Sequence, residues 1–187
     1  MVEDGDEDAL KPAELVPIEG GTWSGLLFDN PRIGLAPALT WSFRFPFQEV
    51  SRDYGDSPIF VDVDWLPLPG ADWPAMAGHV VRDVGEFAES SVYFFQHRRY
   101  DTFDLEIVAQ DGPRLHVRTT LSGDLDELGI DPVTADAWLD FTGIVVSLSD
   151  TTPDASALAR LRAFTATDGL SYSPGHIESS YRFTPTG

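Results

Sequence analysis

The stretch FDLEIVAQDGPRLHVRT, residues 103–119, predicts a β-hairpin and is the strongest fold signal in the chain. Apolar and polar residues alternate through both halves, which is the period-two pattern of strands that bury one face. Gln110-Asp111-Gly112 separates the halves and is typical of a three-residue loop with a left-handed glycine. We expect the cross-strand pairs Phe103–Thr119, Asp104–Arg118, Leu105–Val117, Glu106–His116 and Ile107–Leu115.

Alternation outside this hairpin predicts that most of the chain forms strands. The clearest instance is residues 40–48, where aromatic residues occupy every second position. Pro46 lies within this segment, and because proline cannot donate to a β-ladder we expect it at a sheet edge or a bulge. The other expected strands are residues 20–28, 59–65, 91–100, 135–148 and 176–183.

Helical signals are fewer. Residues 153–165 combine Thr152 as a cap, Pro153 in the first turn and an apolar stripe, which together predict a helix. Residues 72–89 also keep a helical spacing of apolar residues, although two glycines weaken that pattern.

These elements lack the strict β-α-β alternation of a parallel sheet. We therefore predict a mainly β or α+β fold: an antiparallel sheet, as a sandwich or a partly closed barrel, with the helix of the C-terminal half packed on it. A chain of 187 residues with 42% hydrophobic residues suits one domain with a substantial core. We expect a flexible acidic tail over residues 1–15 and a single β-rich domain over residues 16–187.

The chain is strongly acidic, with 31 Asp and Glu residues, 12 Lys and Arg residues and a formal net charge of −19. This charge disfavours nucleic acids and anionic membranes as partners and favours a basic protein. A salt-rich cytoplasm or a GC-rich genome also explains such a composition, and the sequence leaves these explanations open. Cysteine is absent, which excludes disulfides and thiol chemistry. The acidic N-terminus without an apolar run predicts a cytoplasmic protein.

The candidate binding residues surround a proline-rich connection, residues 65–74, which contains two tryptophans. Such an apolar connection either folds back over the core or presents its tryptophans to a partner as anchors. In the second case the neighbouring carboxylates suit a basic protein surface. The candidate partner-binding residues are Asp62, Asp64, Trp65, Asp72 and Trp73.

Asp62 and Asp64 share one face of an expected strand, about 7 Å apart at ~3.3 Å per residue, with Trp65 on the opposite face. This pair is compatible with a shared cation, with the two carboxylates of a hydrolase, or with a solvated acidic surface. A hard cation takes about six oxygen ligands, and the histidines show no ligand spacing. We therefore expect no metal site and no cofactor.

Arg98 and Arg99 form the main local basic cluster, at the exit of an expected strand. They either bind an anionic ligand or neutralise neighbouring carboxylates. No serine lies in a nucleophile elbow, so nucleophilic hydrolysis has no support.

Gly21-Thr22-Trp23 opens the first expected strand, and Arg182 lies in the last. This pattern resembles the glycine-x-tryptophan signature of lipocalin-like and nitrobindin-like barrels, in which an arginine from a late strand packs on the tryptophan. The resemblance covers only the ends of the chain. It implies a barrel that holds a small ligand.

The leading functional hypothesis is a non-enzymatic, acidic protein-binding module, such as an immunity or inhibitor protein that neutralises a basic toxin or enzyme. The alternative is a lipocalin-like barrel that binds a small apolar ligand in an aromatic-lined interior. A hydrolase that uses carboxylates comes third, and it requires a cleft in which two carboxyl groups titrate apart.

Overall fold

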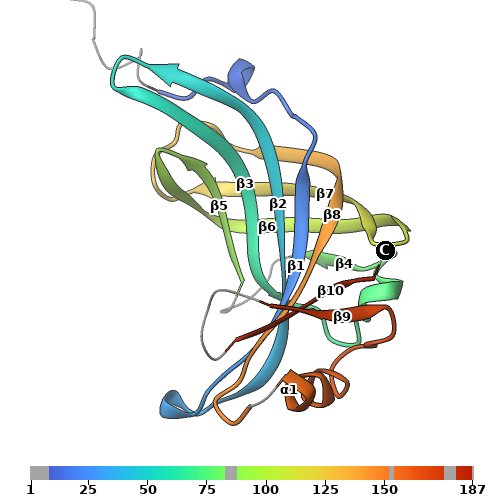
Figure 1. Ribbon diagram of the computed structural model, residues 1–187. Helices are drawn as coiled ribbons and strands as arrows, with labels where there is room; N and C mark the ends of the chain where they lie inside the picture. Colours follow the sequence, from blue (N-terminus) through green and yellow to red (C-terminus); the bar gives the residue numbers. More distant parts are fainter. Residues whose placement is uncertain (1–8, 83–87, 152–153, 175–179, 187) are drawn as a thin grey trace, which may run out of the picture.

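The computed structural model describes residues 9–82, 88–151, 154–174 and 180–186, and it is mainly β-structure (Figure 1). Its strands are β1 (Gly21–Asn30), β2 (Leu35–Arg52), β3 (Gly55–Pro67), β4 (Val80–Arg82), β5 (Glu89–Phe94), β6 (Gln96–Asp111), β7 (Arg114–Asp124), β8 (Val133–Ser147), β9 (Leu170–Ser173) and β10 (Tyr181–Pro185). Its helical elements are α1 (Asp154–Leu161) and the 3-10 turns η1 (Pro12–Glu14), η2 (Pro31–Ile33) and η3 (Trp73–Ala75).

The sheet closes into a seven-stranded barrel in the order β1-β2-β3-β5-β6-β7-β8, with β8 pairing back to β1. The β8–β1 pair is parallel, whereas the other neighbours are antiparallel. Closure depends on the length of β8, because residues 133–140 pair with β7 and residues 139–147 with β1. The expected mainly β class is confirmed, but the sheet is a closed barrel and not a sandwich.

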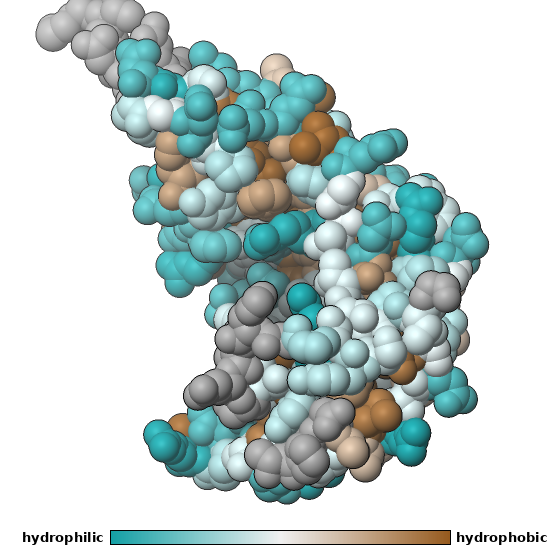
Figure 2. Space-filling view, in the orientation of Figure 1, coloured by the Kyte–Doolittle hydropathy of each residue, from teal (hydrophilic) through white to brown (hydrophobic). Residues whose placement is uncertain are grey.

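Large aromatic side chains occupy the barrel interior, while hydrophilic side chains cover most of the surface seen in Figure 2. The ring centroids of Trp41 and Trp23 are 5.6 Å apart, and Phe141 stacks on Trp23 at 4.2 Å. Trp73 stacks on the same phenylalanine at 5.2 Å. Trp23 Nε1 donates to the carbonyl of Pro113 at 3.0 Å, so this buried indole N–H is satisfied.

Strands β6 and β7 form the predicted hairpin with the predicted core face, but the expected register is wrong by two residues. The observed pairs are Phe103–Leu121, Leu105–Thr119, Ile107–Val117 and, at the turn, Asp111–Arg114. The turn therefore consists of two residues, Gly112, with φ of 55°, and Pro113, instead of the expected three. A bulge between Ile107 and Ala109 shifts the register by one residue between this turn and the rest of the hairpin. A slip of two residues keeps the same side chains inward, so alternation cannot reveal it.

Pro46 lies in an interior strand, beyond the end of the β1–β2 ladder, where residues 16–18 pair with β2 in place of β1. The ladder between β1 and β2 ends at the pair Thr22–Arg44, so no β1 carbonyl lies opposite Pro46 and the missing N–H leaves no β1 acceptor without a donor. The Pro46 carbonyl accepts from Ile18 N–H at 3.1 Å. The expectation of a sheet edge at Pro46 is therefore wrong, while the alternative of a bulge is met close by, since the register with β3 shifts between Phe47 and Val50.

Two segments differ from what the sequence patterns indicated, one from an ambiguous helical pattern and one from an expected strand. Instead of a helix from residue 72, the chain forms only the short turn η3 and then β4, and residues 83–87 lie outside the described residues. The single strand expected over residues 91–100 is two strands, because Phe95 adopts φ of 57° and reverses the chain between β5 and β6.

Helix α1 confirms the helix expected near residues 153–165, although it ends at Leu161. Leu161 and Ala157 are fully buried, and α1 lies at the lower end of the barrel in Figure 1. The last expected strand is confirmed from Tyr181 onward, while residues 175–179 lie outside the described residues.

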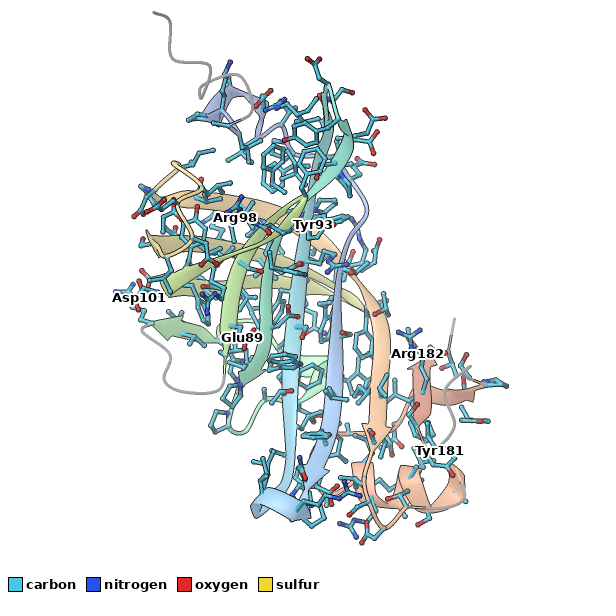
Figure 3. The ribbon with its side chains drawn as sticks, turned by 90° about the vertical axis from the view of Figure 1, so that its left-hand side faces the viewer. Glu89, Tyr93, Arg98, Asp101, Tyr181 and Arg182 are labelled. Carbon is cyan, nitrogen blue, oxygen red and sulfur yellow. The ribbon has the colours of Figure 1, made fainter. Side chains whose placement is uncertain are left out.

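Arg182 is exposed on β10, which lies at the right of the view in Figure 3, away from Glu89 of β5 on the left. The described ring contacts of Trp23 are with Trp41 and Phe141. The arginine–tryptophan packing implied by the lipocalin-like resemblance is therefore not among the described contacts.

The N-terminal segment packs against the barrel before residue 15. Leu10 is 4% exposed, and Glu14 forms an ion pair with Arg52 at 2.8 Å. Arg52 also donates to the carbonyl of Ala9 and lies over the ring of Phe94. Leu10 and Glu14, which were expected to belong to the acidic tail, therefore pack against the barrel, and residues 1–8 are outside the described residues.

Candidate functional site

The outer wall of the barrel carries a buried ion pair between β2 and β3. Arg44 lies opposite Asp62, and its guanidinium donates from Nε to Oδ1 at 2.8 Å and from Nη2 to Oδ2 at 3.0 Å. Asp62 is only 1% exposed, whereas half of the Arg44 side chain is accessible. Arg44 Cζ also lies 4.7 Å from the ring centroid of Phe60. These contacts fix the Arg44 side chain in one position.

Asp64 lies on the same face two residues further along β3, opposite Glu89 of β5. Burial raises the pKa of Asp64, and the nearby charge of Asp62 raises it further. A hydrogen bond from Ser42 and neighbouring positive charges oppose this shift without cancelling it. Asp64 therefore holds its proton to a higher pH than an ordinary aspartate.

Trp65 leaves the alternation of β3 at a bulge. Its φ is 56°, in the left-handed region that favours glycine, and the register with β2 shifts by one residue at this point. The bulge turns Trp65 outward, where it is 46% exposed, and places Leu66 in the core instead. The Trp65 N–H donates to Ser42 Oγ at 3.3 Å. The expectation that Trp65 faces the other side from the two aspartates is therefore wrong, because alternation does not signal a bulge.

We refer to Arg44, Asp62, Asp64, Trp65 and Glu89 as the carboxylate face. A hollow of about 240 Å³ lies on it, lined by Thr22, Ser24, Ser42, Phe43, Arg44, Asp62 and Asp64. This volume is below the range of about 300–1,000 Å³ that is usual for small-molecule sites, and it suits one side chain of a partner. Asp62 is already paired with Arg44, so the hydroxyl groups and the Asp64 carboxylate are the acceptors that remain for a cationic group.

Asp72 and Trp73 lie in a different environment from Trp65, at one end of the barrel. Asp72 Oδ1 accepts from Thr165 Oγ1 at 2.7 Å and from Ala166 N at 2.6 Å. The N–H of Trp73 donates to Thr165 Oγ1 at 3.0 Å, and its ring is buried against Phe141. Of the five predicted partner-binding residues, the structure thus brings together Asp62, Asp64 and Trp65.

Arg98 and Arg99 alternate across β6 and both contact Asp126. The guanidinium of Arg99 donates from Nε and Nη2 to the two carboxylate oxygens of Asp126 at 3.1 and 3.0 Å. Arg98 donates to the carbonyl of Asp126 at 3.0 Å. The hydrogen bonds from the Arg99 side chain, followed by that from its N–H, lower the pKa of Asp126 to about 2. Arg99 is thus paired with a neighbouring carboxylate, whereas Arg98 bonds the main chain of the same residue.

The sequence analysis missed Arg44, Ser42 and Glu89 as members of the site. The alternation in residues 40–48 already placed Ser42 and Arg44 on a polar face. Only the strand order, however, puts β2 and β5 on either side of β3, and strand order is a property of non-local pairing.

Within the ranges that the structure describes, no group of three or more His, Asp or Glu side chains is arranged to hold a metal ion. None of the described helices is long and apolar enough to cross a membrane. Comparisons with known proteins give no match, either to a family model, to a curated protein or to a solved structure. The fold and the site define a closed β-barrel with a carboxylate face on its outer wall.

Proposed function

We propose that this protein is a non-enzymatic binding module that takes a positively charged protein partner on its carboxylate face. The observation that carries the proposal is that Asp64 and Trp65, two neighbours on β3, both adopt states that are unfavourable for folding. Residues of this kind persist where they serve function, because selection for stability alone would replace them.

Trp65 is unfavourable in two respects. A left-handed backbone costs a residue with a Cβ roughly 1–2 kcal/mol, and glycine would avoid that cost. The indole is also half exposed, so its apolar surface is only partly removed from water. Tryptophan is enriched among the residues that contribute most to interface binding energy, so an outward-facing tryptophan suits the role of an anchor.

Asp64 is unfavourable because its charge is close to the buried charge of Asp62 and is itself partly desolvated. A cation from a partner would favour the charged form of Asp64 and so offset both the repulsion by Asp62 and the loss of hydration. Glu89, exposed on the neighbouring strand, adds a further acceptor for the same cation. The face therefore favours a lysine or arginine side chain near Asp64 and Glu89, with the exposed Trp65 as a separate apolar contact on the same face.

The net charge of −19 extends this preference beyond the local contact. A strongly acidic protein attracts a basic partner over a distance, so association is fast and weakens as salt rises. An inhibitor or immunity protein that covers a basic enzyme is one form that such a module takes.

The test compares variants of the full chain as bait in a lysate of the host, at low and high salt, with native mass spectrometry of the captured complex. The binding variants are Trp65→Ala and the double variant Asp64→Asn, Glu89→Gln. Trp138→Ala is the matched control, because Trp138 is a similarly exposed tryptophan (40%) on β8, where it lies between Arg114 and His116.

We expect a stoichiometric basic protein on the wild type and on Trp138→Ala that is lost at high salt and from both binding variants. A partner that remains on Trp65→Ala and on the double variant would contradict the proposal.

A further inference from the structure

A second hollow lies between the start of β6 and the loop that follows β7. Its volume is about 380 Å³, within the range usual for small-molecule sites. Arg98, its one arginine, is labelled in Figure 3 near Tyr93 of the neighbouring strand β5. None of the residues of the carboxylate face lines this hollow. The lining residues are Gln96, His97, Arg98, Leu125, Asp126 and Glu127.

The hollow forms because β7 stops pairing with β6 before it reaches the β5–β6 turn. The last ladder pair is Tyr100–Asp124, and one further backbone bond follows, from Leu125 N–H to the carbonyl of Arg99 at 3.0 Å. The Asp126 carboxylate then accepts from the N–H of Arg99 at 2.8 Å, in the place of a backbone carbonyl. Residues 96–98 therefore pair with β5 on one side and border the hollow on the other.

Arg98 brings a positive charge to this hollow, and its hydrogen-bond partners there are neutral. Nη1 donates to the carbonyl of Asp126 at 3.0 Å. The amide oxygen of Gln96 accepts from Nη1 and Nη2 at 3.0 Å each when it is oriented toward these donors. Because both partners line the hollow, the guanidinium lies among the lining residues.

No described carboxylate forms an ion pair with Arg98. The carboxylate of Asp126 is paired with Arg99, and the charge of Arg98 is the smallest of the causes that lower the pKa of Asp126. A guanidinium has five N–H donors. In the part of the chain that the structure describes, the Nε–H and one Nη2 hydrogen of Arg98 therefore remain for a further acceptor.

Glu127 brings a negative charge to the same hollow. Its side chain is exposed and makes no hydrogen bond or ion pair with any described residue, so its carboxylate is available to a ligand. Its φ is 57°, a left-handed conformation that is unfavourable for a residue with a Cβ. Positions held in such conformations cluster at binding sites. Leu125, which is 54% exposed, adds an apolar contact.

The charges restrict the kind of ligand. A simple anion is repelled by a protein of net charge −19, and a simple cation leaves Arg98 without an acceptor. A zwitterion has no net charge to be repelled, and it offers a carboxylate to Arg98 and an ammonium group to Glu127. These two residues do not pair with each other, so neither has to give up a partner.

We infer that this hollow binds an α-amino acid with an apolar side chain. The carboxylate of the ligand accepts from Arg98, its ammonium group faces Glu127, and its side chain lies against Leu125. This site does not depend on the carboxylate face, so either can exist without the other.

The experiment titrates the ¹⁵N-labelled full chain with L-leucine at pH 7 and constant ionic strength. It follows the backbone amide signals of residues 125–129 and the Nε–H signal of Arg98, which is assigned by its absence in Arg98→Gln. We expect saturable shifts of these signals.

Two probes each lack one charged group of leucine: 4-methylpentanoate lacks the ammonium group, and 3-methylbutylamine lacks the carboxylate. We expect each probe to bind about tenfold more weakly than leucine, because it loses one charge-assisted hydrogen bond.

Two variants assign these groups to residues. Glu127→Gln should weaken leucine binding by about tenfold while leaving the binding of 4-methylpentanoate no weaker, since that probe has no ammonium group. Arg98→Gln should likewise remove the advantage of leucine over 3-methylbutylamine. A variant that only disturbed the loop would weaken all three ligands together. Arg160→Gln, at an exposed arginine of α1 that is paired with Asp150, is the control and should bind leucine as the wild type does.

The absence of a saturable shift up to the solubility limit of leucine would overturn the inference. Equal binding of leucine and 4-methylpentanoate by the wild type would overturn it as well, as would an unchanged leucine titration in Glu127→Gln or in Arg98→Gln.

Discussion

The backbone N–H of Trp65 donates to Oγ of Ser42 at 3.3 Å, and the same serine hydroxyl hydrogen-bonds to Asp64. Ser42 therefore connects the two residues of β3 that are least favourable for folding. The bulge that exposes the tryptophan and the carboxyl group with the raised pKa belong to one local structure.

The strain at Trp65 predicts an inverted order of stability for two substitutions. Glycine in a strand is usually less stable than alanine by roughly 0.5–1 kcal/mol, but at a φ of 56° alanine retains the backbone strain that glycine relieves. We expect the free energy of unfolding of Trp65→Gly, measured by urea denaturation, to be about 1 kcal/mol higher than that of Trp65→Ala. Thr134, exposed on β8 and without a positive φ, is the control, and there alanine should be the more stable variant.

Asp64→Asn should stabilise the protein at pH 7 while weakening its binding to a basic partner. A raised pKa means that the folded state favours the protonated carboxyl group. The protonated carboxyl group of Asp64 therefore contributes to the stability of the fold below the unfolded-state pKa of 3.8, and this contribution is lost as the pH rises through the folded-state pKa. Asparagine imitates the protonated form, so the gain measured by thermal unfolding should vanish near pH 3. An equal gain at both pH values would mean that charge is not the cause.

The ion pair between Arg44 and Asp62 should show strong coupling. Arg44→Met leaves a carboxylate that is 1% exposed without its partner, which we expect to cost about 3 kcal/mol. Adding Asp62→Leu removes the stranded charge and should recover most of the loss. A double-mutant cycle by urea denaturation measures the coupling, and additive losses would contradict a mutually dependent pair.

Asp126 should stabilise the fold in a defined range of acid pH. Its pKa is lowered from 3.8 to about 2, so the stabilisation is present above the unfolded value and is lost as the pH falls through about 2. Arg99→Gln should return the pKa of Asp126 towards 3.8, as followed by NMR of the carboxyl carbon. A pKa that stays near 2 in this variant would show that Arg99 is not the main cause.

Much of the local structure could be predicted from residues close together in the chain. The strand at 40–48, the hairpin face, the strand at 135–148 and the helix near residue 154 follow from alternation, capping and turn residues, which act over a few positions. The errors fall where two local patterns are equivalent. The predicted hairpin register differs from the observed one by two residues, because a shift of two residues keeps the same side chains in the core. The bulge at Trp65 was not predicted, because the alternation of the residues before it is undisturbed.

For the site, the residues alone already predicted the acidic charge, the absence of thiol chemistry and the shared face of Asp62 and Asp64. Three features emerged only from the folded barrel: the parallel β8–β1 pair that closes the sheet, the position of Arg44 and Glu89 beside those aspartates, and the different surroundings of Trp65 and Trp73. These features could not be predicted because strand order and closure depend on contacts between distant segments. Their energies are summed over the whole barrel, whereas propensity and alternation are set by neighbours in the chain.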